Sequence, residues 1–171
     1  MPTRYLTKSR FKLALSCPTK LYYTGKKNYA NANDGNEFLA MLADGGFQVG
    51  ELAKCMYPQG IEIAAKDTHQ AVAQTTELLK KESVVLFEPA IVFGGFLVRA
   101  DVLFKRGDVL EVIEVKAKSY SGDPSSLSGK RKAISGDMLS YVQDVAFQKY
   151  VVQKAFPACT VSASLLMPDK S

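Results

Sequence analysis

Three charged residues within two apolar segments have the types and spacing needed for chemistry. Glu114 and Lys116 lie two positions apart in the run VLEVIEVK, and Asp101 lies thirteen positions before Glu114. Side chains alternate across a β-strand, so Glu114 and Lys116 are expected on one face. A tight turn between the two segments would fold Asp101 back toward Glu114. The pattern therefore predicts two carboxylates and one amine side by side.

Charges in such apolar strands are costly unless they are paired or bind a metal. Carboxylate oxygens, with backbone carbonyls and waters, suit Mg²⁺ or Mn²⁺, which can activate water and polarise a phosphoryl oxygen. Lys116 is expected to orient or deprotonate that water, because a desolvated lysine beside a metal has a lowered pKa. The residues predict metal-dependent phosphodiester hydrolysis. The alternative is an ordinary interaction domain in which Asp101, Glu114 and Lys116 form a buried ion pair that only fixes strand register.

The segments around these residues predict a β-meander. β-branched and aromatic runs at residues 83–93, 96–104 and 109–118 predict three strands, and glycine turns between them indicate antiparallel pairing. Capping residues, among them Thr7 and Asp67, and helical spacing predict the helices. The predicted helices cover residues 7–15, 18–23, 34–44, 49–56, 67–79 and 137–156, with Gly45 and Gly46 as an interruption, and a last strand covers 160–167. This order predicts an α/β fold.

Composition limits the class of protein. The 171 residues predict one domain, helical at about 5–82 and with a sheet-and-helix core at about 83–168. No apolar run could cross a bilayer, which favours a cytoplasmic protein without membrane contact. The three cysteines include no C-x-x-C pair, which argues against a zinc site or a disulfide framework. The net charge of +5 favours a polyanion such as nucleic acid as partner.

The motifs Arg99-Ala100-Asp101 and Glu114-Val115-Lys116, in this order of elements, resemble those of the PD-(D/E)XK nuclease superfamily. The chain is most similar to its RecB-like branch, which includes the exonuclease of CRISPR spacer acquisition. An uncharacterised bacterial domain of that branch, with a GFQVGELA-like helix and a Phe-Glu-Pro strand, is the closest likeness. The resemblance implies a restriction-endonuclease-like core of order α-β-β-β-α-β, a central mixed sheet flanked by helices, and extra N-terminal helices.

The resemblance also implies roles for individual residues. Asp101 and Glu114 would bind the metal together with the backbone carbonyl of Val115, and Lys116 would position the nucleophilic water. Glu88 matches an acidic residue that the branch places beside the metal, so it would bind the ion directly or through water. The roles of Val115 and Glu88 come from the family likeness alone.

A helix glutamine of the branch is matched by Gln148, which would lie near the active site and help to hold substrate or the lysine. Asp144 lies one helical turn earlier on the same face. Members of the branch often have a tyrosine four residues after the glutamine, whereas Tyr150 follows here after only two.

Two departures from the family pattern concern metals. Many relatives carry a histidine ligand four residues after a glycine, but a second glycine stands at that distance from Gly46. Glu51 is the nearest residue that could replace it. Cys17 resembles the first cysteine of an iron–sulfur cluster in some relatives, but only Cys159 lies near the C-terminus, and a cluster needs four thiolates. No cluster is expected.

The sequence thus predicts a Mg²⁺- or Mn²⁺-dependent deoxyribonuclease with weak sequence preference, and the branch favours exonuclease action. Lys118 and the basic loop of Lys130, Arg131 and Lys132 are expected to bind backbone phosphates. The alternative on the same fold is a catalytically silent nucleic-acid-binding or regulatory module. The end of the chain directly after the last strand suggests either a piece of a longer protein with further domains or a small free-standing member.

Overall fold

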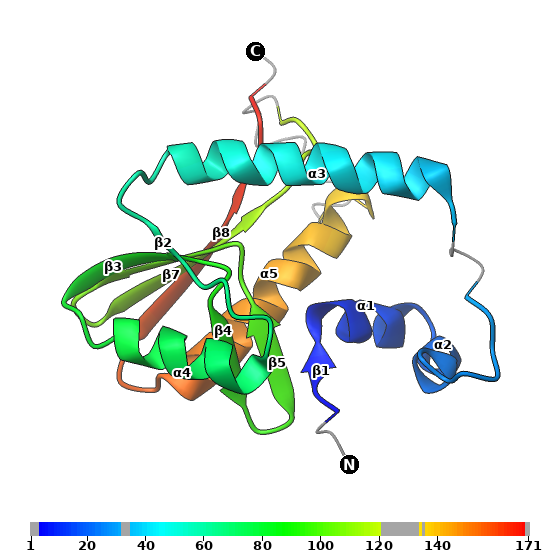
Figure 1. Ribbon diagram of the computed structural model, residues 1–171, viewed down its shortest axis with the longest axis horizontal. Coiled ribbons are helices and arrows are strands. Elements are labelled where there is room, and N and C mark those ends of the chain that lie inside the picture. The colour runs from blue at the N-terminus through cyan, green and yellow to red at the C-terminus, as the bar shows by residue number, and fades with distance from the viewer. Residues whose placement is uncertain (1–3, 32–34, 121–133, 135, 170–171) are drawn as a thin grey trace.

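The computed structural model describes residues 4–31, 35–120, 134 and 136–169. This part of the chain forms two β-sheets flanked by helices (Figure 1). The larger sheet has the strand order β2-β3-β6-β7-β8, and the smaller has the order β1-β5-β4. The strands are β1 (Leu6–Thr7), β2 (Ile61–Glu62), β3 (Ser83–Phe87), β4 (Ala90–Phe93), β5 (Phe96–Arg99), β6 (Val102–Arg106), β7 (Val109–Val115) and β8 (Thr160–Leu166).

The larger sheet is mixed. Strands β3, β6 and β7 pair antiparallel, whereas β2 pairs parallel with β3 and β8 pairs parallel with β7. The turn between β6 and β7 contains Gly107 at φ 58°, a left-handed conformation that glycine adopts without steric cost. The α/β class with a mixed sheet flanked by helices is therefore confirmed, and the short strands β1 and β2 add to the predicted set.

The first two predicted strands are each divided in the structure. Residues 83–93 form β3 and β4, and residues 96–104 form β5 and the first part of β6. Each arm of this hairpin is divided because β3 and β6 belong to the larger sheet, whereas β4 and β5 belong to the smaller one. Pro89 has no backbone N–H for the ladder, and Glu88 before it has φ 54°. Hydrogen bonds from Glu88 N to Asp101 O and from Ala100 N to Pro89 O hold the two chains together at the bend. The prediction of unbroken strands was wrong at this point.

In the described part of the chain, five helices surround the sheets. They are α1 (Lys8–Ser16), α2 (Pro18–Tyr23), α3 (Glu37–Cys55), α4 (Thr68–Leu78) and α5 (Gly136–Ala155). Thr7 caps α1 and Asp67 caps α4, each by accepting a hydrogen bond from a backbone N–H of the first turn, as predicted. The interruption of α3 at Gly45 and Gly46 was wrong, since the helix runs through both; each glycine costs only about 1 kcal/mol in a helix. Asn36 caps it.

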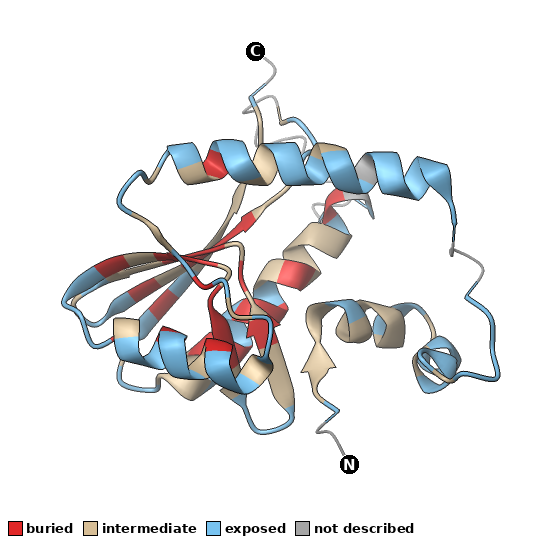
Figure 2. Ribbon diagram, viewed as in Figure 1, coloured by how far each residue is buried: buried red, intermediate tan, exposed pale blue. Residues whose placement is uncertain are grey.

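The main core lies between α5 and the two sheets. It contains Phe147, Val151 and Val152 of α5 against strand residues such as Leu103 and Val112, all buried. Figure 2 shows this concentration of buried residues, and it shows α3 exposed along most of its length. No described helix is long and apolar enough to cross a membrane.

Candidate active site

Asp101 and Glu114 lie at the same end of neighbouring strands. Val102 pairs with Ile113, so Asp101 just before β6 and Glu114 near the end of β7 are one position beyond that pair. Asp101 Oδ2 also accepts a hydrogen bond of 2.6 Å from the backbone N–H of Val115. The bend of the hairpin at Asp101 thus orients this carboxylate toward the end of β7.

Glu114 is buried, with 1% of its surface exposed. Its Oε1 accepts hydrogen bonds of 2.5 Å from Lys116 Nζ and from Lys8 Nζ. Its Oε2 accepts one of 2.5 Å from Gln148 Nε2. The predicted neighbours Lys116 and Gln148 therefore meet at Glu114, together with a second ammonium from α1.

A second buried carboxylate, Asp144 of α5, completes the charge network. Its Oδ2 lies 3.2 Å from Lys116 Nζ and 3.2 Å from Lys12 Nζ. Its Oδ1 and the Oε1 of Gln148 are buried acceptors that have no hydrogen-bond partner among the described residues. Three ammonium groups thus surround two buried carboxylates, and two acceptors remain for donors or a cation.

Burial and proximity separate the pKa values of the two strand carboxylates. Burial, followed by the negative charge of Glu114, raises the pKa of Asp101 from 3.8 to about 6. Burial also acts to raise the pKa of Glu114, but the charges and hydrogen bonds of Lys8 and Lys116 outweigh it and hold that pKa below its usual value. Glu114 is therefore charged at neutral pH. Burial and the repulsion between the two carboxylates together raise the pKa of Asp101.

The pKa of Lys116 differs from the lowered value that the sequence predicts. Burial acts to lower the pKa of its ammonium, but the hydrogen bond and charge of Glu114 and the charge of Asp144 raise the pKa above its ordinary value. Lys116 is accordingly a cation in this network. Its geometry suits orientation of a water or stabilisation of negative charge, and the lowered pKa expected of a general base is not found.

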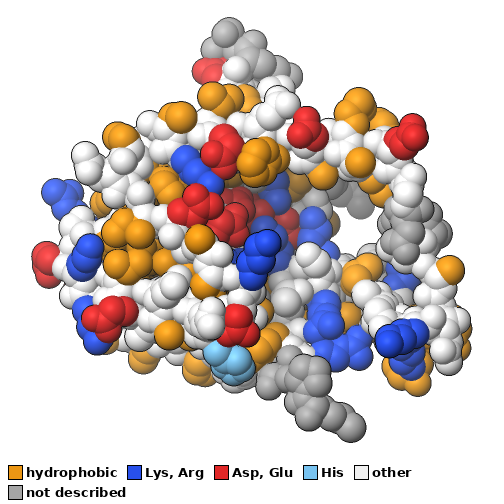
Figure 3. All heavy atoms as spheres, in the orientation of Figure 1, with side chains coloured by type: hydrophobic (Ala, Val, Ile, Leu, Met, Phe, Trp, Pro, Cys, Tyr) orange, Lys and Arg blue, Asp and Glu red, His pale blue; other side chains and the backbone are white. Residues whose placement is uncertain are grey.

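A pocket of about 230 Å³ lies in front of Asp101. Glu51, Glu62, Glu88 and Asp101 line it together with Lys54 and Val115. Helix α3 brings Glu51 to this pocket, where Lys54 Nζ lies 2.9 Å from Glu51 Oε1 and 3.1 Å from Glu62 Oε1. Figure 3 shows acidic and basic side chains gathered in the middle of this face, below α3.

The backbone at Glu88 is held by the Arg99 side chain. The Arg99 guanidinium donates to the carbonyl oxygens of Ile63 at 3.1 Å, Ala65 at 3.0 Å and Glu88 at 3.2 Å. The Glu88 carboxylate is 46% exposed, and its Oε2 lies 3.9 Å from Arg99 Nε. Arg99 therefore fixes the bend that directs Glu88 to the pocket.

The oxygen donors match a hard divalent cation in kind. Asp101 and Glu114 lie close enough to interact, and Mg²⁺ commonly uses one or two carboxylates with several waters. Among the described residues, however, no three histidine, cysteine or acidic side chains are close enough to one another to hold an ion. The pocket acids would have to be joined by waters or substrate oxygens to complete a coordination shell.

The predicted phosphate-binding residues are placed only in part. Lys130, Arg131 and Lys132 lie outside the described residues, and Lys118 follows β7 beyond the site. The structure instead brings Lys8 and Lys12 to the carboxylates, which sequence reasoning missed. Their spacing of four places them on one face of a helix, but the sequence does not say what that face contacts.

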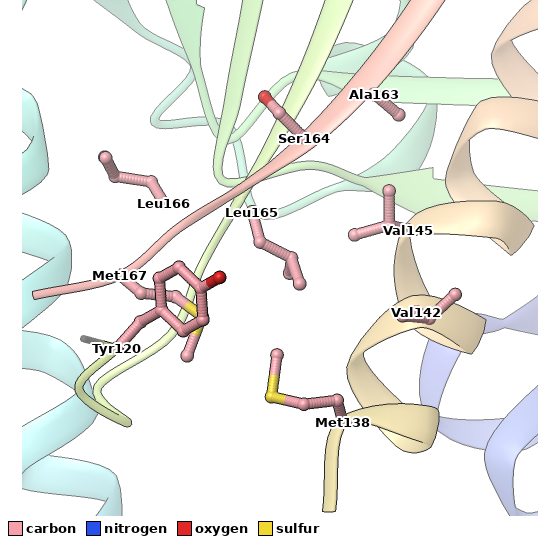
Figure 4. Close-up of a pocket in the computed structure, with 9 residues that line it drawn as sticks. All are labelled: Tyr120, Met138, Val142, Val145, Ala163, Ser164, Leu165, Leu166 and Met167. Carbon is pink, nitrogen blue, oxygen red and sulfur yellow. The ribbon is translucent and has the colours of Figure 1, made fainter. Parts of the chain in front are cut away.

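A larger pocket of about 510 Å³ lies between α5 and β8 (Figure 4). Its walls are mostly apolar, with Met138 and Val142 of α5 facing Leu165 of β8, and none of the described residues that line it is acidic or basic. It has none of the groups needed for phosphodiester chemistry, so the carboxylate pocket is the candidate active site.

Comparison with models of known protein families, with curated proteins and with solved structures finds no match for this chain. The case for a function therefore depends on the site itself.

Proposed function

We propose that this chain is a Mg²⁺- or Mn²⁺-dependent DNA nuclease of the PD-(D/E)XK type. The observation that carries the proposal is the meeting of Asp101, Glu114 and Lys116, with the pKa of Asp101 raised to about 6. In a purely structural ion pair a base balances the acid. Among the described residues the Asp101 carboxylate accepts a hydrogen bond from the backbone N–H of Val115, and the charge of Lys8 lowers its pKa by less than burial and Glu114 raise it. Such an incompletely compensated carboxylate is a mark of a functional site.

Asp101, Glu114 and the carbonyl of Val115 would hold the ion, and Glu88 and Glu51 line the pocket in front of Asp101. When bound, the metal would lower the pKa of a water and polarise the phosphoryl oxygen. Lys116, a cation held between Glu114 and Asp144, would orient the attacking water and stabilise charge on the phosphate. Gln148 fixes Glu114 through its Oε2 and so acts as a positioning residue.

The fold proposal follows the same reasoning. The three segments β3, β6 and β7, followed by α5 and β8, fit the restriction-endonuclease-like core expected from the order of motifs. Exonuclease action and weak sequence preference are proposed from the likeness of the motifs to the RecB-like branch and from phosphate contacts, which carry little sequence information.

The test is degradation of labelled single- and double-stranded DNA in Mn²⁺ or EDTA. Glu114→Ala and Lys116→Ala are expected to lower the rate about 100-fold or more. Glu111→Ala and Lys105→Ala are matched controls, since Glu111 lies on the same strand with its carboxylate bonded to Ser164, and the Lys105 ammonium bonds the Lys81 carbonyl. Equal degradation by Glu114→Ala and the parent would refute the proposal.

A second candidate is a nucleic-acid-binding module on the same fold that does not cleave. It is favoured by the absence of three metal-binding side chains close together among the described residues. This module would bind DNA equally well with or without Mn²⁺ and would leave the DNA intact in both.

A further inference from the structure

The N-terminal arm, defined as residues 4–31, has an unusual charge. Residues 1–33 contain seven lysines and arginines and no acidic residue, although the whole chain has 22 basic and 17 acidic residues. Figure 3 shows basic side chains over both α1 and α2. The positive charge of the protein is thus concentrated in this arm, which suits a polyanionic ligand.

The outer end of the arm exposes an aromatic cluster of Tyr22, Tyr23, Tyr29 and Lys26. The Tyr22 and Tyr23 rings lie 5.0 Å apart, and those of Tyr23 and Tyr29 lie 4.5 Å apart. Lys26 Nζ lies 3.2 Å from the centre of the Tyr22 ring. The three tyrosines are nevertheless 62%, 39% and 57% exposed, so the cluster is ordered by its own contacts and presents ring faces to solvent.

The inner end of the arm lies in the candidate active site. There Lys8 contacts Glu114 and Lys12 contacts Asp144. Pairing of β1 with β5 and stacking of Phe11 on Phe147, with ring centres 4.8 Å apart, fix α1 in this position. A chain of phosphates that follows the arm inward from α2 would therefore reach the carboxylates (Figure 1).

We propose that the arm is a binding track for single-stranded nucleic acid, with Lys8 and Lys12 on the phosphates and the tyrosines of the aromatic cluster stacked on unpaired bases. The track rests on the proposed function in that it leads to the candidate active site. Exposed rings beside lysines suit bases that are not already stacked inside a duplex. Duplex DNA could bind the ammonium groups through its phosphates, but its bases are already stacked on one another and would not stack on the tyrosine rings.

The first test is fluorescence anisotropy in EDTA, where no cleavage occurs, with an oligothymidylate of about twelve nucleotides and a duplex of similar length. Tyr22→Ala and Tyr29→Ala should each raise the Kd for the single strand about 5- to 100-fold and change the Kd for the duplex less than about 2-fold. Tyr22→Phe keeps the ring and should bind like the parent. Circular dichroism confirms that each variant is folded.

Tyr150→Ala is the matched control, because Tyr150 on α5 is 49% exposed and also has a lysine, Lys154, over its ring. It should not change either Kd. The proposal is overturned if the parent binds no oligonucleotide, if the alanine variants bind like the parent, or if they lose single strand and duplex equally.

The lysine half of the track is tested by salt dependence. Lys8→Gln with Lys12→Gln should reduce the slope of log Kd against log salt by about 1 to 2, since each lost phosphate contact removes nearly one released counterion. Lys80→Gln, at an exposed lysine paired with Glu77, is the control. An unchanged slope would show that Lys8 and Lys12 do not contact the phosphates.

These outcomes separate the track from the nuclease proposal. Tyrosine-dependent binding in EDTA without any cleavage in Mn²⁺ would support the track and refute the nuclease. Cleavage that depends on Glu114, together with binding that is unchanged in the tyrosine variants, would support the nuclease and refute the track.

Discussion

Gln148 Nε2 donates a hydrogen bond of 2.5 Å to Glu114 Oε2, and neither side chain exposes more than 1% of its surface. A helix residue and a strand residue that are 34 positions apart thus form one buried unit. This contact ties the long helix α5 to the strand that carries the candidate catalytic carboxylate, so the geometry of the site depends on their packing.

Gln148→Met should lower stability and activity together. Methionine has similar volume but no donor, so a buried charged oxygen of Glu114 loses its partner, which costs about 1–3 kcal/mol. Urea unfolding and DNA cleavage are the measurements. Gln153→Met is the control on the same helix, since Gln153 bonds the Cys159 carbonyl and should cost stability without slowing cleavage. Cleavage by Gln148→Met at the parent rate would contradict a positioning role.

Asp101→Asn should stabilise the metal-free protein at neutral pH. The folded pKa of Asp101 is about 6 and the unfolded value is 3.8, so the folded state holds the proton more tightly. The stability from this group is therefore present below about pH 4 and is lost as the pH rises through about 6. The difference corresponds to at most about 3 kcal/mol.

The measurement for Asp101→Asn is thermal unfolding in EDTA at about pH 4 and at about pH 7.5. The variant should gain stability over the parent mainly at the higher pH, because asparagine carries no charge and can still accept from Val115 N. A gain of equal size at both pH values would show that the charge of Asp101 is not the cause.

Glu88 adopts φ 54°, which costs about 1–2 kcal/mol for a residue with a Cβ. Glu88→Gly relieves that strain, whereas Glu88→Ala keeps it, and both remove the carboxylate. The glycine variant should therefore be more stable than the alanine variant by about 1 kcal/mol, while both bind Mn²⁺ more weakly than the parent. Urea unfolding and calorimetric titration of Mn²⁺ give the two quantities. An alanine variant at least as stable as the glycine variant would contradict the strain.

Phe11→Ala should release α1 from α5. Phe11 stacks on Phe147 at the main core, so its loss is expected to cost about 2–4 kcal/mol and to weaken nucleic-acid binding through Lys8 and Lys12. Leu15→Ala is the control, because Leu15 on the same helix is 51% exposed. Unfolding and anisotropy measurements check both effects. If Phe11→Ala is destabilised but binds nucleic acid as tightly as the parent, the position of α1 does not matter for binding.

Much of the local structure could be predicted from the sequence because it depends on short-range patterns. The caps Thr7 and Asp67, the glycine turns and the start of α2 at Pro18 all depend on neighbouring residues. The meeting of Glu114 and Lys116 followed from the alternation of a strand, and it is present in the structure.

The features that sequence reasoning missed depend on long-range packing. The strand break at Glu88 arises where one hairpin joins two sheets, which no local pattern specifies. Lys8 reaches Glu114 across 106 positions, through the docking of α1 on α5. Likewise, the pKa of Lys116 is raised by Glu114 and also by Asp144, which lies on a helix whose position the sequence does not give.

The most direct test of the central claim is a crystal of the protein soaked in Mn²⁺, with an anomalous difference map. The account predicts one peak about 2.2 Å from carboxylate oxygens of both Asp101 and Glu114 and close to the Val115 carbonyl, with no such peak in a Glu114→Ala crystal. Manganese bound elsewhere, or at only one of the two carboxylates, would contradict it.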